Sequence, residues 1–130
     1  MEKDFQLSLE QLAWELFEKA VQSKGAMVIP NLFFNRGVLL GELGDLKGAR
    51  KEFMTALDEA SHESNSGIRE QVIVISHDAL GILAFKEKNY KEALQWFQNA
   101  LQEQHSFGGN WVQDLDPKLK QMEVLIGSSK

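Results

Sequence analysis

The sequence predicts an all-α protein, a solenoid of stacked helical hairpins with about six helices. One observation is a repeat. In each copy a glycine lies twelve residues before an alanine, a phenylalanine follows that alanine by four residues, and a second alanine follows the phenylalanine by three. The two copies are Gly37, Ala49, Phe53 and Ala56, and Gly81, Ala93, Phe97 and Ala100. The other observation is that apolar residues recur at intervals of three and four, the period of a helix with one buried face. Repeats of this kind indicate stacked hairpins, in which small residues let two helices approach and each phenylalanine fills the gap beside them.

The composition is that of one globular domain spanning residues 1–130. Apolar residues make up 43% of the chain and charged residues 25%, ordinary values for a folded protein. A net charge of −5 argues against nucleic acid as a partner, because neutralising phosphates needs clustered Lys and Arg. The absence of cysteine excludes disulfides and thiolate zinc sites. No apolar run reaches the ~20 residues that cross a bilayer and the first residues lack a signal-peptide pattern, so we expect a cytoplasmic protein without membrane insertion.

A first helix is predicted over residues 8–24. Ser8 can cap its start together with Gln11, and Gly25 follows its end. Three residues within it repeat the spacing found in the second helix of each hairpin, namely Ala13, Phe17 and Ala20. We therefore interpret this helix as the second half of an earlier hairpin.

The first full repeat is predicted over residues 30–63. Pro30 suits the first turn of a helix, where its missing N–H has no partner to lose, and Gly44 suits the end of that helix. Asp45 then caps the second helix of the hairpin.

The second full repeat is predicted over residues 67–105, with Asn89 as the cap of its second helix. Its alanine lies 44 residues after that of the first repeat. The additional residues predict that the helix following Gly67 is unusually long.

A capping helix is predicted over residues 116–127, because the last hairpin of a solenoid would otherwise leave an apolar face in water. Asp116 is expected to cap this helix, Pro117 to occupy its first turn and Gly127 to end it. Trp111, in the preceding loop, is expected to pin the helix or, alternatively, to contact a partner.

These motifs resemble the tetratricopeptide repeat, as two full repeats, a preceding half repeat and a capping helix. The resemblance covers Ser8 to about Gln104 and implies a right-handed superhelix of helical hairpins. The sequence departs from the family where a tryptophan is usual, since Phe33 and His77 stand there. The 44-residue offset also exceeds the ~34 residues of a typical repeat, which affects the curvature of the stack.

In this family the first helix of each hairpin lines a concave surface that usually contacts the partner. By that resemblance the partner-binding residues are predicted to be Asn31, Phe34, Asn35, Val38, Glu42, Ile75, Asp78, Ile82, Phe85 and Lys86. Members that grip a peptide's terminal carboxylate use Lys, Asn and Arg on these helices. At the corresponding positions this chain keeps only Asn35, so the comparison argues against a carboxylate clamp. The predicted surface is mostly apolar, with Asn31 and Asn35 placed to hydrogen-bond a peptide backbone.

The sequence leaves open what occupies an apolar groove of this kind. The groove is core if the capping helix or the segment Phe5-Gln6-Leu7 covers it. It is a site for an amphipathic helix or an extended peptide if it is open, and a dimer interface if two chains bury it against each other.

No residue pattern indicates catalysis, a cofactor or a metal site. His62, His77 and His105 lie on separate segments, and no glycine-rich phosphate loop or activated nucleophile occurs. We therefore predict a non-catalytic protein-interaction module, an adaptor or assembly chaperone that binds a partner peptide or helix. A self-associating structural homodimer is the alternative, and an enzyme or metal protein that depends on His62 or His77 is a remote one.

Overall fold

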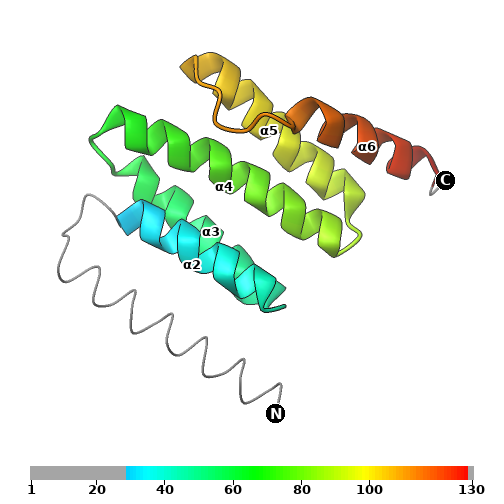
Figure 1. The fold of residues 1–130 in the computed structure, drawn as a ribbon, viewed down its shortest axis with the longest axis horizontal. Helices are drawn as coiled ribbons and strands as arrows, with labels where there is room; N and C mark the ends of the chain where they lie inside the picture. The colour runs from blue at the N-terminus through cyan, green and yellow to red at the C-terminus, as the bar shows by residue number, and fades with distance from the viewer. Residues whose placement is uncertain (1–28, 129–130) are drawn as a thin grey trace, which may run out of the picture.

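The computed structural model describes residues 29–128, which form five α-helices (Figure 1). The helices α2 (Ile29–Glu42) and α3 (Leu46–Ser61) form one hairpin, and α4 (Ser66–Lys86) and α5 (Tyr90–Phe107) form a second. The last helix, α6 (Leu115–Ser128), packs on α5. No strand occurs among these residues, so the prediction of an all-α fold of helical hairpins is confirmed. The helix expected over residues 8–24 lies outside the described residues.

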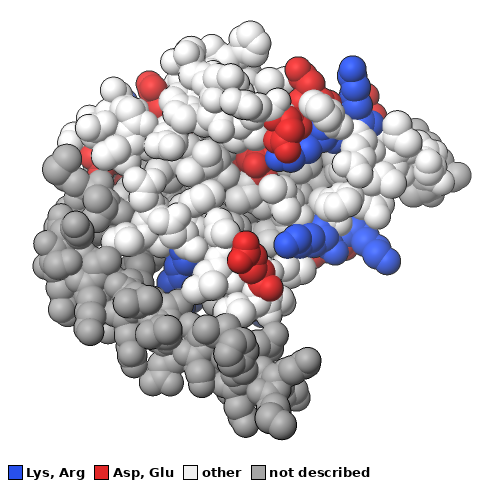
Figure 2. All heavy atoms as spheres, in the orientation of Figure 1, with Lys and Arg blue, Asp and Glu red and all other residues white. Residues whose placement is uncertain are grey.

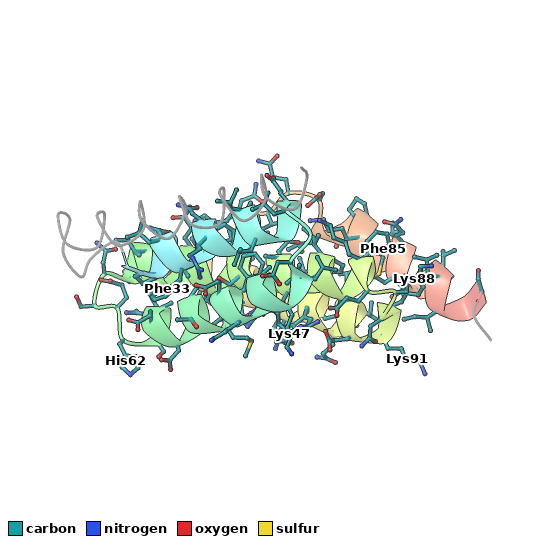
Figure 3. All side chains as sticks on the ribbon, turned by 90° about the horizontal axis from the view of Figure 1, so that it is seen from below. Phe33, Lys47, His62, Phe85, Lys88 and Lys91 are labelled. Carbon is teal, nitrogen blue, oxygen red and sulfur yellow. The ribbon has the colours of Figure 1, made fainter. Side chains whose placement is uncertain are left out.

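The helices are arranged in layers around α4, which contacts α2, α3 and α5. Viewed from below, α2 and α6 lie on one side of the molecule and α3 and α5 on the other (Figure 3). Phe85 lies on the side of α2 and α6, whereas Lys47, His62 and Lys91 lie on the opposite side. The first helices of the hairpins and the last helix therefore share one face.

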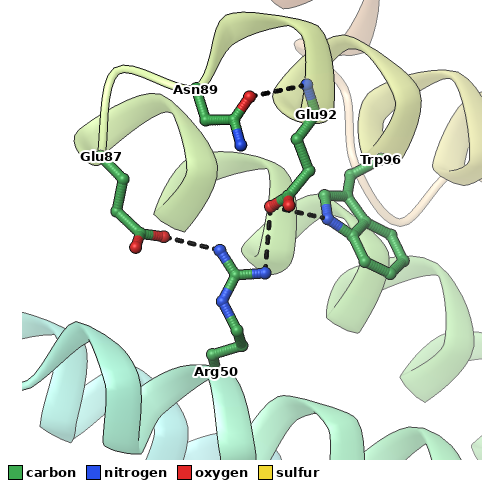
Figure 4. A network of polar contacts seen from close by, with 5 residues as sticks. All are labelled: Arg50, Glu87, Asn89, Glu92 and Trp96. Atoms are coloured by element: carbon green, nitrogen blue, oxygen red, sulfur yellow. Dashed lines mark hydrogen bonds and ion pairs between the residues drawn. The ribbon is translucent and has the colours of Figure 1, made fainter.

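Short polar side chains set the helix starts. The Asp45 carboxylate accepts a hydrogen bond of 2.8 Å from the Gly48 N–H, and the Asn65 side chain accepts one of 3.0 Å from the Ile68 N–H. Asn89 caps α5 in the same way (Figure 4). Each cap satisfies an N–H that has no partner within its helix.

In both hairpins a glycine of the first helix packs against a phenylalanine of the second. An added Cβ at Gly37 would lie 2.6 Å from a ring atom of Phe53, and one at Gly81 would lie 2.5 Å from a ring atom of Phe97. Both rings are almost fully buried. In each hairpin the ring of the second helix therefore lies directly on the backbone of the first, where only glycine leaves room.

An ion-pair network joins the two hairpins (Figure 4). The guanidinium of Arg50 on α3 lies 2.6 Å from the Glu87 carboxylate, in the turn between α4 and α5, and 3.0 Å from that of Glu92 on α5. Glu92 also accepts a 3.4 Å hydrogen bond from the indole N–H of Trp96. These contacts link α3 to the start of the second helix of the next hairpin.

The end of the stack differs from the sequence prediction by one residue. α6 begins at Leu115, so Asp116 lies within the first turn and does not cap the helix. The Lys118 N–H instead donates to the backbone carbonyl of Asp114. Pro117 also lies in the first turn, where the missing N–H costs nothing.

Gln104 holds the connection between α5 and α6. Its amide nitrogen donates to the Val112 carbonyl at 2.9 Å, and its amide oxygen accepts from the Val112 N–H at 2.8 Å. Trp111 packs edge-on against Phe107 and over Gly109. This connection is therefore fixed to α5 by both polar and aromatic contacts.

Candidate functional site

A groove runs along α4 between α2 and α6. Its largest hollow has a volume of about 520 Å³, with Phe34 and Val38 of α2 on one wall. The floor is a single stripe of α4 that consists of Ile75, Asp78, Ala79 and Ile82. The opposite wall is formed by residues 111–114 and by Lys118 of α6. We call this surface the α4 groove.

Two smaller hollows, each of about 220 Å³, extend the groove. One lies between α2 and the end of α4, with Glu42 and Lys86 at its edge. The other lies between α4 and α6 and is lined in part by Phe85 and Gln121. Ile82 lines all three hollows, so they lie next to one another along α4.

Apolar side chains in the groove reach solvent. Val38 is 37% exposed and Phe85 is 36% exposed, both high values for large apolar residues. Phe34 is half-buried, because its ring packs against Phe53 with the ring centroids 5.4 Å apart. The groove therefore combines exposed apolar groups with others that are part of the core.

The structure brings together most of the predicted partner-binding residues. Those that line at least one hollow are Phe34, Val38, Glu42, Ile75, Asp78, Ile82, Phe85 and Lys86. Asn31 is half-buried and Asn35 is exposed, and neither lines any of the three hollows. A role for these two asparagines in binding a partner stays a prediction.

The capping helix covers the groove only in part. Leu115 and Met122 of α6 are buried in the core that includes Phe97, with Ile82 packed against it. The hollow between α4 and α6 remains next to that contact. α6 therefore forms a wall of the groove, and Phe85 stays exposed beside it.

The charged side chains of the central hollow form a triad. The Lys118 ammonium lies 2.8 Å from one Asp78 carboxylate oxygen and 2.8 Å from one of Asp114. Burial raises the pKa of Asp78, and this effect exceeds the opposing one of its hydrogen bond to Lys118. Burial lowers the pKa of Lys118, but its hydrogen bonds to Asp114 and Asp78 outweigh that, and its pKa is raised. Figure 2 shows acidic and basic side chains side by side near the start of α6.

The sequence predicted only part of this site. It missed the wall formed by Val112, Gln113, Asp114 and Lys118, since Asp78 and Lys118 are forty positions apart. Trp111 had a signal, as a large aromatic residue placed directly after a break in helical periodicity. Its ring both packs against Phe107 and lines the hollow.

His77 takes a packing role in this structure. Its ring stacks on that of Trp96, with the centroids 5.4 Å apart, and its Nδ1 pairs with the Glu103 carboxylate. Burial raises the pKa of Glu103, more than the nearby His77 lowers it. Within residues 29–128 no group of three or more His, Asp or Glu side chains is arranged to hold a metal ion.

Comparison with known proteins identifies one segment of the chain. Residues 74–106 match the family model described as Tetratricopeptide repeat. The match begins at Val74 within α4 and ends at Ser106 near the end of α5, so the first eight residues of α4 precede it. No curated protein matches the chain. No helix of the described part is long and apolar enough to cross a membrane.

Proposed function

Since residues 74–106 show this chain to be a tetratricopeptide repeat protein, we propose that it is a non-catalytic adaptor or assembly chaperone that binds a partner in the α4 groove. Repeats of this family generally mediate protein–protein interaction. The number of repeats beyond the matched one, the cytoplasmic location and the homodimer alternative stay predictions.

One observation carries the proposal: the apolar depression along α4 is open to solvent between two walls. Exposed apolar surface is costly in water and, where it is contiguous, marks an interaction site. A segment lying along α4 would bury Ile75 and Ile82 beneath it and Val38 at its side. Such an arrangement suits an amphipathic helix or an extended peptide that offers apolar side chains at regular intervals.

The test compares two Val→Asp variants that differ only in place. Val38 lines two hollows of the groove, whereas Val124, on α6, lines none of the three. Both side chains are exposed, at 37% and 66%, so neither substitution places a charge in the core. Val38→Asp is therefore preferable to a change at Phe34, whose ring supports the packing of Phe53.

The readout is selection from a library of random peptides displayed on phage, followed by titration of the selected peptides. We expect wild type and Val124→Asp to select the same peptides and Val38→Asp to lose at least about tenfold in affinity, because an unpaired charge resists desolvation. Equal selection by Val38→Asp would count against the groove as the binding site. The solution mass of the three proteins over a concentration series tests the alternative. A dimer that only Val38→Asp disrupts, without any selected peptide, favours self-association.

A further inference from the structure

We propose that the α4 groove selects a partner segment in which an apolar side chain is flanked by a lysine or an arginine. The inference rests on the proposed function, since it names the chemistry of the segment that this groove would hold. It rests on two observations. The charged side chains that the structure describes in the central hollow carry an excess negative charge, and only one of them is exposed to a partner.

The central hollow carries one negative charge in excess. Its charged side chains are Asp78, Asp114 and Lys118, and the single ammonium serves both carboxylates at 2.8 Å each. Glu42 and Lys86, which line the neighbouring hollow, carry opposite charges and leave the balance unchanged. The net charge of −5 has the same sign and favours the approach of a basic segment.

Only one member of the triad is open to a partner. The Asp114 side chain is 63% exposed, compared with 13% for Asp78 and 19% for Lys118. A basic side chain that enters the hollow can therefore pair with Asp114 without disturbing the contact between Lys118 and Asp78. Apolar walls exclude water on one side and strengthen this attraction relative to open solvent.

A carboxylate of a partner would find no free cation among the described residues of the central hollow. The ammonium of Lys118 already has two carboxylate partners, so a third would have to displace one of them and then face it as a like charge. Charge arrangements of this kind affect specificity more than overall affinity. The hollow thus selects against acidic segments and peptide C-termini.

The apolar and the charged parts of the hollow lie on different walls. Phe34 and Val38 stand on α2, whereas Asp114 stands next to the start of α6, with the α4 stripe between them. From Ile75 to Ile82 this stripe covers about 10 Å, or roughly two helical turns. A bound segment would accordingly place apolar side chains on α4 and α2 and extend its basic side chain toward α6.

The test uses peptides obtained by the phage selection, restricted to those that Val38→Asp fails to bind. We expect these sequences to be enriched in Lys or Arg next to aliphatic or aromatic residues. The strongest peptide is then synthesised with its basic residue unchanged, replaced by Gln, or replaced by Glu. Affinities are measured by the fluorescence of the protein's tryptophans, because Trp111 lines the hollow. The Gln peptide should bind about two- to fivefold more weakly and the Glu peptide about tenfold more weakly.

Two protein variants locate the effect. Asp114→Asn should remove most of the difference between the basic and the Gln peptide, whereas Asp116→Asn should leave it intact. Asp116 is the matched control, because it is an exposed carboxylate in the first turn of α6 that does not line the hollow.

The outcomes separate this inference from the proposed function. Groove-dependent peptides without basic enrichment, or equal effects of the two variants, overturn the inference and leave the groove as a binding site. Selected peptides that Val38→Asp binds as well as wild type overturn both. A groove-dependent preference for basic peptides that Asp114→Asn abolishes supports both.

Discussion

Replacing Gly81 by alanine tests the close helix packing on which the second hairpin depends. The added Cβ would lie 2.5, 2.6 and 2.9 Å from three ring atoms of Phe97, where about 3.5 Å is needed. That ring is 2% exposed, so it cannot move into solvent and α4 and α5 must separate. Overpacking costs about 1–3 kcal/mol, and the better helix propensity of alanine returns up to about 1 kcal/mol. We expect a net loss of about 1–2 kcal/mol in the free energy of unfolding.

Gly41→Ala is the matched control for this prediction. Its added Cβ would lie 3.7 Å from the Ala49 Cβ and 3.8 Å from a Leu83 methyl group, which are ordinary contacts. This variant should be as stable as wild type or gain up to about 1 kcal/mol. Urea unfolding followed by far-ultraviolet circular dichroism measures both. Equal stability of the Gly81→Ala and Gly41→Ala proteins would refute the packing argument. Combining Gly81→Ala with Phe97→Leu should cost less than the sum of the two single changes, because the smaller side chain leaves room.

Two further predictions concern the polar contacts around the groove. Gln104→Ala removes both hydrogen bonds to Val112 and should lower the free energy of unfolding by about 2 kcal/mol. Hydrogen exchange at the Val112 amide should become faster. Unchanged exchange would show that other contacts hold the connection between α5 and α6. Asp78→Asn tests the effect of burial on a carboxyl group whose pKa is raised above 3.8 on folding. Protonated Asp78 stabilises the fold below the unfolded pKa, and this contribution is lost as the pH rises through the folded pKa. The stability of wild type relative to Asp78→Asn should therefore fall as the pH rises above 3.8. Asp116→Asn is the control, and a difference that rises with pH would contradict the assigned direction.

The helical hairpins were predictable because their signals are local. The Gly81 and Phe97 spacing recurs as Gly37 and Phe53, and the structure places both pairs in contact. Helix starts followed from single capping residues such as Asp45. The start of α6 was misplaced by one residue, because the helix includes Leu115, which is buried in the core and precedes the expected cap Asp116.

The residues predicted for the groove come from α2 and α4, the first helices of the two hairpins. The α4 stripe follows from helical period, since Ile75, Ala79 and Ile82 must lie on one face. The far wall required tertiary information. Neither the contact of Lys118 with Asp78 nor the hold of Gln104 on Val112 is encoded by spacing, because each depends on the path of the chain after α5.

Lys118 connects the two roles of the last helix. It lies on the same stripe of α6 as Leu115 and Met122, both 2% exposed, where an apolar side chain would serve the core. The Lys118 ammonium lies 5.5 Å from the centroid of the buried Phe97 ring, so this lysine contacts the core as well as the groove. Its ammonium also pairs with Asp78 of α4 and with Asp114, and the two carboxylates together carry one more charge than the single ammonium neutralises. One side chain of α6 therefore links the core around Phe97 to the charged part of the groove.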